Sequence, residues 1–361
     1  MKKIIVNGQS LNEKETYGIQ RNTIQILFEL DRIIEKGTVE LILPPWETNH
    51  LKFENIVVNR MDVLKIGKSK KFLWNHKYFP RYVKDKGGIG VDMLLAMPIL
   101  GCDVISIYDC IPERFPQNYL SWKDRLKRKF YMYKVGNAVH KSKIILTDSN
   151  SAKVDISTIY HCNPQKIRVI YCGWQHFESV TEDETVIEKL NLQGKKYCFS
   201  LGSHFVHKNH RWIMAAAEQN PKYTFVVTGS DSISKSDKGL KREMPENVIY
   251  TGYLSDEELK ALMKNCMVFI QPSLYEGFGI PPMEAMSTGT RCIVSNMSSL
   301  PEVYGHSVWY IDPYQYNDID IDRIMSEEID DNDLVLHKFS WEKSARELKK
   351  IFDKLARGET L

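Results

Sequence analysis

The chain has 361 residues, a formal net charge of +3 and an apolar share of 43%. This length favours two domains, because a single hydrophobic core stops growing at roughly 250–300 residues. The composition is typical of a globular protein, and no apolar run is long enough to span a bilayer. The seven cysteines include no Cys-x-x-Cys pair, which argues against a disulfide framework and indicates reduced core residues of a cytoplasmic protein.

Charge is distributed unevenly along the chain. Residues 1–180 hold 28 Lys and Arg against 18 Asp and Glu, a balance of +10, and the remaining 21 and 28 leave −7. We expect the basic first half to face an anionic partner. Nucleic acid and a membrane surface both qualify on charge, but the sequence contains no recognisable nucleic-acid-binding module.

The chain begins with a predicted strand, a glycine-containing loop and a helix. Residues 4–6 form the apolar strand, residues 16–21 form the loop with Gly18, and apolar residues at helical spacing follow over residues 24–30. Backbone N–H groups at such a helix start can hold a phosphate. Taken alone, this glycine is explained equally well by an ordinary entry into a helix.

Residues 122–134 combine basic and aromatic side chains. Trp122, Leu126, Phe130 and Tyr133 recur at helical spacing, so the predicted helix has one apolar face and one strongly positive face. Two interpretations stay open. The helix lies on an anionic bilayer surface, or it packs its apolar face into the core and leaves a basic face in solvent.

The second half repeats the order of strand, loop and helix. A predicted strand at residues 197–201 leads into the loop 202–209, which contains Lys208, and a helix follows. The predicted strands 223–228 and 248–250 each end in a glycine-containing turn. Strands that alternate with helices in this way predict an α/β fold.

The most informative stretch is residues 273–290, which follow the short apolar strand 268–270. Here a glycine-containing turn runs into a helix that starts with two prolines, so backbone N–H donors and the positive end of a helix dipole meet. Two carboxylates, Glu276 and Glu284, accompany this anion site. Because a carboxylate repels phosphate, both are better explained as acceptors for hydroxyl groups. A nucleotide sugar carries both phosphates and hydroxyl groups, so we expect a ligand of this class.

Glu276 and Glu284, separated by seven residues within Tyr-Glu-Gly-Phe-Gly-Ile-Pro-Pro-Met-Glu-Ala-Met, resemble the signature of the family-4 retaining glycosyltransferases. The resemblance extends over nearly the whole chain. It implies the GT-B fold, an α/β architecture of two Rossmann-like doubly wound domains that face each other across a cleft. The implied domains are residues 1–175 on the acceptor side and residues 176–339 for the nucleotide sugar, and the helix 340–356 is expected to pack back on the first domain.

The resemblance also implies a set of site residues. Lys208 would meet the donor's diphosphate, Glu276 would hold hydroxyls of the transferred sugar, and Glu284 would hold the ribose diol. The residues implied to act in catalysis are Glu276, Lys208 and Asp109. Those implied to bind the donor are Gly18, Ser203, His207, Lys208, Gly252, Tyr253, Glu276, Gly277, Phe278, Gly279, Ile280 and Glu284.

Asp109 follows a predicted buried strand at residues 102–108, in a segment that resembles the family's cleft edge of the N-terminal domain. Many relatives have histidine where this chain has Tyr108, so Asp109 is the better candidate at this edge. Its alternative role is to fix the turn that follows it, as short acidic side chains often do.

Neither a metal ion nor another cofactor is expected. His204, His207 and His210 recur at intervals of three, but the run begins in a loop and contains Lys208, whose charge would oppose a metal ion. The Asp-rich residues 318–333 follow no hydrophobic strand and are expected to form a solvated loop.

We therefore expect a hexosyltransferase of polysaccharide biosynthesis. It would move a hexose or deoxyhexose from a nucleotide diphosphate sugar to a hydroxyl of a glycan acceptor, expected to be lipid-linked. We expect it in the cytoplasm, with an anionic membrane surface at the inner face of the cell membrane as a further partner, and without nucleic acid. The alternative is a catalytically silent subunit or sensor of the same fold that binds a sugar nucleotide.

Overall fold

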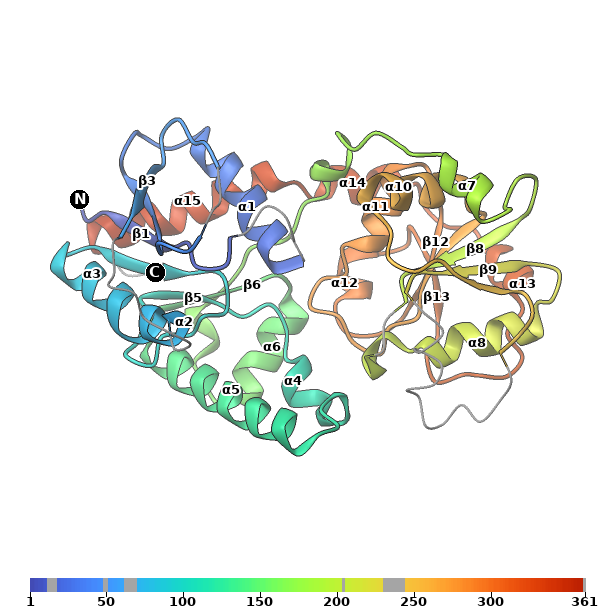
Figure 1. Ribbon diagram of the computed structural model, residues 1–361, viewed down its shortest axis with the longest axis horizontal. Helices are drawn as coiled ribbons and strands as arrows, with labels where there is room; N and C mark the ends of the chain where they lie inside the picture. Colours follow the sequence, from blue (N-terminus) through green and yellow to red (C-terminus); the bar gives the residue numbers. More distant parts are fainter. Residues whose placement is uncertain (12–17, 48–50, 62–69, 203–204, 230–243, 360–361) are drawn as a thin grey trace. The chain divides into compact units, whose positions relative to one another are not determined.

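The computed structural model describes residues 1–11, 18–47, 51–61, 70–202, 205–229 and 244–359. The chain divides into two compact units, each built around its own sheet (Figure 1). Unit 1 comprises Met1–Glu113, Tyr119–Gly173 and Ser340–Leu361. Unit 2 comprises Trp174–Phe339 together with the short segment Arg114–Asn118.

Unit 1 contains a seven-stranded parallel sheet in the order β3-β2-β1-β4-β5-β6-β7. The central strands are buried on both faces, which is why they read as continuous apolar runs rather than as alternating patterns. The strands are β1 Ile4–Asn7, β2 Val39–Leu43, β3 Val57–Arg60, β4 Ile89–Asp92, β5 Val104–Ser106, β6 Ile144–Thr147 and β7 Ile167–Val169.

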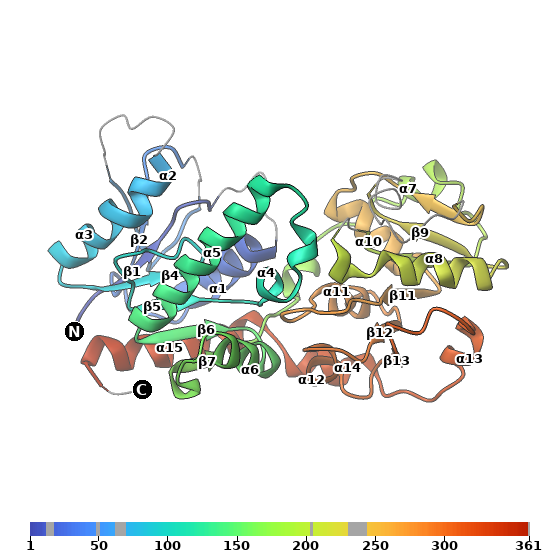
Figure 2. The same cartoon turned by 90° about the horizontal axis from the view of Figure 1, so that it is seen from below.

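Helices cover both faces of this sheet. One face carries α1 Gly18–Asp31 and α15 Trp341–Arg357, which pack against each other (Figure 1). The other face carries α3 Phe79–Asp85, α5 Trp122–Lys141 and α6 Asn150–Ile159 (Figure 2). Shorter helical segments are α2 Lys70–Leu73, the π-helix η2 Trp74–Tyr78, α4 Ile111–Arg114, η3 Pro116–Asn118 and η4 Pro164–Lys166.

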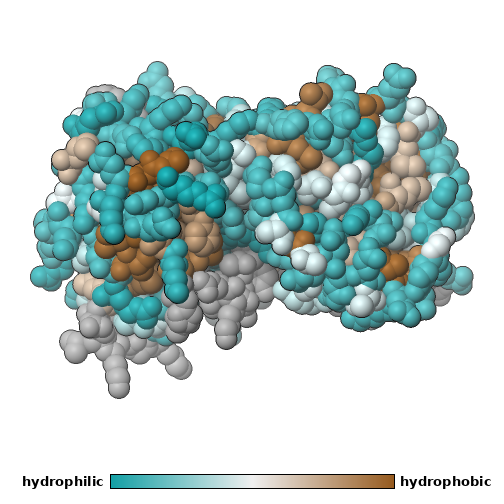
Figure 3. All heavy atoms as spheres, turned by 90° about the horizontal axis from the view of Figure 1, so that it is seen from above, coloured by the Kyte–Doolittle hydropathy of each residue, from teal (hydrophilic) through white to brown (hydrophobic). Residues whose placement is uncertain are grey.

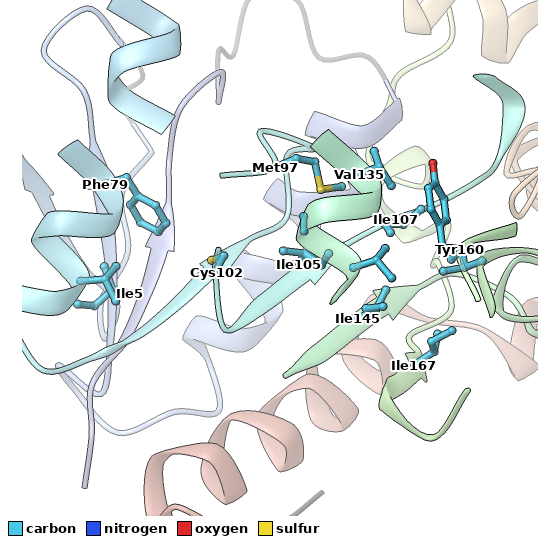
Figure 4. Close-up of a cluster of buried hydrophobic side chains, with 14 of the residues drawn as sticks. Ile5, Phe79, Met97, Cys102, Ile105, Ile107, Val135, Ile145, Tyr160 and Ile167 are labelled. Carbon is cyan, nitrogen blue, oxygen red and sulfur yellow. The ribbon is translucent and has the colours of Figure 1, made fainter. Parts of the chain in front are cut away.

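The core of unit 1 on the second face joins these helices to the strands (Figure 4). Phe79 of α3 and Val135 of α5 pack with strand residues such as Ile105 and Ile145. The apolar face of α5 predicted from its spacing is not part of this core. Trp122, Leu126, Phe130 and Tyr133 are 71%, 60%, 45% and 62% exposed, so of the two interpretations left open for this helix, the one that packs its apolar face into the core is wrong.

The core contacts of α5 come from its C-terminal half instead. Val135, Ala138 and Val139 are its buried residues, and they lie on the opposite side of the helix from the exposed aromatic residues. The Ser121 side chain caps the helix by accepting a hydrogen bond from the Asp124 N–H at 3.1 Å. The exposed residues therefore belong to a well-formed helix that presents them to its surroundings.

Unit 2 contains a six-stranded parallel sheet in the order β10-β9-β8-β11-β12-β13. The chain first builds outward from β8 to β10, then returns beside β8 and builds outward on the other side. The order therefore reverses between β8 and β11. The strands are β8 Tyr197–Ser200, β9 Thr224–Val227, β10 Val248–Tyr250, β11 Val268–Gln271, β12 Cys292–Ser295 and β13 Trp309–Ile311.

The helices of unit 2 also lie on both faces of its sheet (Figure 1). Ser255 and Glu258 form a capping box at the start of α10. The helices are α7 Thr185–Lys189, α8 His210–Gln219, α10 Asp256–Asn265, α11 Pro281–Ser287, α12 Leu300–Tyr304, α13 Ile321–Met325 and α14 Asn332–Lys338, with the short segments η5 Gln175–Phe177 and η6 Val206–Lys208. Two doubly wound α/β units were predicted, and this fold class is confirmed.

The surface of both units is mostly hydrophilic on the face drawn in Figure 3, where hydrophobic residues are exposed in small groups. Among the described residues, no helix combines the length and the apolar character needed to cross a membrane.

Candidate functional site

The candidate site of unit 2 lies where the strand order reverses. In a parallel sheet all strands end at the same edge, and a ligand crevice forms at the point where connections leave in opposite directions. The loop that follows β8 carries Lys208, and the loop that follows β11 carries Glu276. A hydrogen bond at 2.7 Å from the Leu274 N–H to the His207 carbonyl joins the two loops directly.

Glu276 and Lys208 form a largely buried ion pair at this place. Lys208 Nζ lies 2.8 Å from Glu276 Oε1 and 3.1 Å from Oε2. Oε1 also accepts hydrogen bonds from Ser273 Oγ at 2.6 Å and Gln271 Nε2 at 3.1 Å. Burial alone would raise the pKa of Glu276, but the positive charge of Lys208 and these donors lower it on balance. Glu276 is therefore a carboxylate although it is buried.

Hydrogen bonds from the loop after β12 hold the turn that follows Glu276. Ser298 Oγ donates to the Glu276 carbonyl at 2.5 Å, and Ser299 Oγ lies 3.1 Å from the carbonyl oxygens of both Glu276 and Phe278. Gly279 has φ +88°, and a Cβ atom there would lie 2.6 Å from Leu300 Cδ2. Only glycine fits this backbone without displacing a neighbour.

The remaining residues of this turn divide between packing and helix entry. The Phe278 ring is buried and packs edge-to-face on Phe339, with ring centroids 5.4 Å apart. Ile280 is the N-cap residue of α11, and its carbonyl accepts the Met283 N–H at 2.8 Å. Gly277 lies between Glu276 and Phe278 in the turn. The strand, glycine turn and helix predicted for this stretch are confirmed.

Glu284 on α11 has a partner that the sequence did not reveal. His176 Nε2 lies 3.0 Å from Glu284 Oε1, and both side chains are almost fully buried. His176 belongs to η5, at the start of unit 2. Its neighbours fix this segment, because Trp174 Nε1 donates to the Leu336 carbonyl at 3.0 Å and Gln175 Nε2 to the Phe339 carbonyl at 3.1 Å. No motif around His176 could have predicted a contact across 108 positions.

His207 lies beside the ion pair in an apolar setting. It is buried between Phe205, whose ring stacks on it at 5.6 Å, and Phe115, also at 5.6 Å. Its Nδ1 atom lies 3.2 Å from Asn118 Nδ2. Burial, with the charge of Lys208 as a further cause, lowers the pKa of His207 to about 4. The imidazole is therefore neutral, and Lys208 is the cation of this loop.

Other predicted donor residues of unit 2 lie at ends of neighbouring strands. Gly252, with φ +79°, follows β10 and pairs with Gly229 through two hydrogen bonds of 2.8 Å. The adjacent Tyr253 is 87% exposed. Ser203 lies outside the described residues.

The two candidates of unit 1 also follow strands of its sheet. Gly18 is the first residue of α1, and a Cβ atom there would meet nothing within 4 Å, so packing does not explain the glycine. Asp109 follows β5, and its Oδ1 accepts the Ile111 N–H at 2.9 Å, which is the turn-fixing contact of the alternative interpretation. The Tyr108 hydroxyl donates to the Met93 carbonyl at 2.9 Å inside unit 1.

The described residues contain no group of three His, Cys, Asp or Glu side chains arranged to hold a metal ion. His207 has the environment given above, whereas His210 Nε2 lies 2.6 Å from the Tyr250 hydroxyl, and His204 falls outside the described part of the chain. In the Asp-rich stretch, Asp320 and Asp331 act as N-caps of α13 and α14. Residues 318–333 were predicted to be a loop, and that prediction is wrong for residues 321–325 and 332–333, which are helical, but right for residues 318–320 and 326–331.

Comparisons with known proteins bear on this geometry. Residues 182–347 match the family described as glycosyl transferases group 1. The chain is 26% identical over 221 residues to the O-antigen chain mannosyltransferase RfbU of Salmonella typhimurium, covering 60% of this chain and 58% of that protein. It is 31% identical over 231 residues to the O-antigen chain mannosyltransferase B of Escherichia coli, covering 60% and 56%. The chain thus spans less than two thirds of these curated relatives.

A likeness of structure extends over both units. The sucrose-phosphate synthase of Thermosynechococcus elongatus superposes with a TM-score of 0.70, at 16% identity, over 99% of this chain and 100% of that chain. At this identity the likeness concerns the fold alone.

We predict that Lys208→Met destabilises the protein by about 1–3 kcal/mol, because it leaves the buried Glu276 carboxylate without its cation. Adding Glu276→Gln to that variant should recover part of the loss. Urea unfolding of the single and double variants measures both effects. Lys222→Met is the matched control, since Lys222 pairs with Asp322 at an exposed position, where solvent screens the pair and its loss should change stability little. Equal losses at the two lysines would contradict the structural role given to the buried pair.

Proposed function

We propose that the chain is a metal-independent retaining hexosyltransferase, because residues 182–347 match the family described as glycosyl transferases group 1. It transfers a sugar from a nucleotide diphosphate donor to a hydroxyl of a growing, lipid-linked surface polysaccharide. The two named relatives are mannosyltransferases of O-antigen chains, which favours mannose as the sugar. Within the group, the spacing of Glu276 and Glu284 favours family 4. The observation that carries the proposal is the Lys208–Glu276 pair at the reversal of the parallel sheet.

The chemistry follows from the charges of that pair. When the bond between the sugar and the diphosphate breaks, negative charge grows on the diphosphate oxygens. Lys208, still 30% exposed, stabilises that charge, with main-chain N–H groups at Gly277, Phe278 and Gly279 as further donors. Glu276 then exchanges Lys208 for hydroxyls of the sugar and holds the ring in place. The departing phosphate accepts the proton of the attacking hydroxyl, as the resemblance implies, so the mechanism requires no protein base.

The rest of the donor is assigned from the strand ends of unit 2. Glu284, oriented by His176, accepts the ribose diol. Tyr253 and Gly252 lie beside the base, where the ring of Tyr253 is free to stack on it because it is exposed. Gly18 approaches the diphosphate and Asp109 contacts the transferred sugar from unit 1. Ser203 and His207 complete the loop around the phosphates.

The alternative function is a sugar-nucleotide-binding subunit without catalysis. Screening UDP-, GDP- and dTDP-sugars by thermal shift, with mannose donors first, identifies the nucleotide. Detection of nucleoside diphosphate release with a lipid-linked acceptor then separates the two functions. Binding without release across the acceptors tested would favour the silent subunit.

We predict that turnover persists in excess EDTA, because Lys208 and not a metal ion neutralises the diphosphate. Lys208→Met should lower kcat about 100-fold or more, the usual cost of one donor to a developing anion. Release of nucleoside diphosphate measures both effects. If EDTA abolished turnover and a divalent ion restored it, the metal-independent mechanism would be overturned.

We predict that Glu284→Ala weakens binding of the free nucleoside diphosphate by about 1.5–3 kcal/mol, the value of hydrogen bonds to a charged group. His176→Ala should weaken it less and His176→Gln least, since glutamine keeps a donor near Oε1. The effects of Glu284→Ala and His176→Ala should not add, because the residues are in contact. Calorimetric titration measures these affinities, and unchanged affinity in Glu284→Ala would remove the ribose assignment.

A second proposal concerns the place of action, and it rests on α5. We propose that unit 1 binds reversibly to an anionic membrane surface through this helix. Its exposed apolar stripe, defined as Trp122, Leu126, Phe130 and Tyr133, can enter the headgroup region. The exposed basic residues Lys123, Arg125, Lys127 and Lys129 of the same helix attract anionic lipid. A cytoplasmic protein would reach a lipid-linked acceptor in this way.

We predict that the protein sediments with vesicles of phosphatidylcholine and phosphatidylglycerol and that salt weakens this binding. Replacing Trp122 and Phe130 by serine should weaken it at every salt concentration, because the loss is apolar. Replacing Lys127 and Lys129 by glutamine should reduce its salt dependence, since each basic residue near the surface contributes about 1 kcal/mol. Equal binding to vesicles of phosphatidylcholine alone would contradict an anionic surface as the partner.

A further inference from the structure

A groove in unit 1 lies outside the candidate site and has a chemistry of its own. It has a volume of about 940 Å³ and lies between α3 and the C-terminal end of α5. Its residues precede β4 and β5 or begin those strands, so it opens at the edge of the sheet opposite to the strand ends that carry Gly18 and Asp109. The donor chemistry therefore makes no use of it.

The groove is cationic. Lys77, Arg81, Lys84 and Lys141 line it, and all four are exposed. The two acidic residues that line it have cationic partners: Asp85 lies 3.6 Å from Arg81, and Asp103 lies 2.8 Å from Lys143, whose side chain is not among the groove's lining residues. Lys77, Lys84 and Lys141 therefore give the groove a surplus of positive charge, which favours an anionic ligand.

One wall of the groove is apolar. Leu100 lines it and is 68% exposed, and Phe79 and Val83 of α3 form buried parts of the lining. A free inorganic anion has no apolar part that could pack against the exposed leucine. Cationic and apolar walls together suit an amphiphile that carries a negative headgroup.

The groove continues the exposed stripe of α5. On this helix the spacing of the stripe leads from Tyr133 to Asn137 and then to Lys141, which lines the groove. Asn137 Nδ2 and Lys141 Nζ both donate to the Ile99 carbonyl, at 2.7 and 2.8 Å, and so hold Leu100 at the end of the stripe. The helices α3 and α5 lie on the same face of the sheet (Figure 2), and residues of both line the groove.

We propose that this groove binds the headgroup of an anionic phospholipid, while α5 lies on the bilayer. The inference rests on the proposed membrane binding and deepens it. The phosphate lies among Lys77, Lys84 and Lys141, and the start of the acyl chains lies over Leu100 and Tyr133. The stripe supplies general membrane affinity, and the groove supplies preference for one class of lipid.

The test compares two triple variants that remove the same charge. Lys77→Gln, Lys84→Gln and Lys141→Gln change the groove, and Lys36→Gln, Lys52→Gln and Lys354→Gln change exposed lysines near α1 and α15. At low salt the groove variant should bind phosphatidylglycerol vesicles on the order of 100-fold more weakly, and the control variant less than twofold. Equal losses of vesicle binding in the two variants would show that only the net charge matters and would overturn the proposal that the groove binds lipid.

A second measurement uses short-chain phosphatidylglycerol below its micelle concentration, so that it does not depend on vesicle binding. The unaltered protein should bind this lipid, and the groove variant should not. If the unaltered protein binds the soluble lipid but not vesicles, the membrane proposal fails and the groove stands. If inorganic phosphate competes as well as the lipid does, the groove is a site for free anions, and the lipid assignment is overturned.

Discussion

A buried carboxylate must be compensated, and the candidate site of unit 2 is built around that constraint. Glu276 keeps its charge because Lys208, Ser273 and Gln271 converge on it from the ends of β8 and β11. Those strands are neighbours because the strand order reverses between them. The hydrogen bond from Leu274 to His207 joins the two loops, so the positions of the charges proposed to meet the donor depend on the sheet and not on the loops alone.

The two units divide the proposed work. Unit 2 holds the proposed donor residues in hydrogen-bonded turns such as the one at Gly279. Unit 1 carries most of the positive charge and an aromatic helix surface, features suited to a bilayer. A transferase that acts on a lipid-linked chain has to combine a soluble donor with an anchored acceptor. The proposed affinity for the donor lies in unit 2, and the proposed affinity for the bilayer lies in unit 1.

Much of this architecture could be predicted because it depends on local pattern. Apolar runs gave the strands, and glycine turns with prolines gave the start of α11. The site was predicted less completely, because contacts such as His176 with Glu284 join residues far apart in sequence. The exposure of Trp122 was undecided for the same reason: periodicity defines a helix face, but only the packing of Val135 and Val139 shows which face is buried. The Asp-rich helices were missed because their aspartates act as caps.

Unit 1 is discontinuous in sequence, and this has a consequence for synthesis. Its last helix, α15, follows all of unit 2 and covers α1 with buried residues such as Leu348 and Phe352. On the ribosome, the main segment of unit 2 is complete at Phe339, whereas α1 still lacks its cover. Of the two units, unit 1 therefore begins to be synthesised first but is completed last. During that interval its apolar face is open to chaperones, and truncations near the C-terminus would harm the N-terminal fold first.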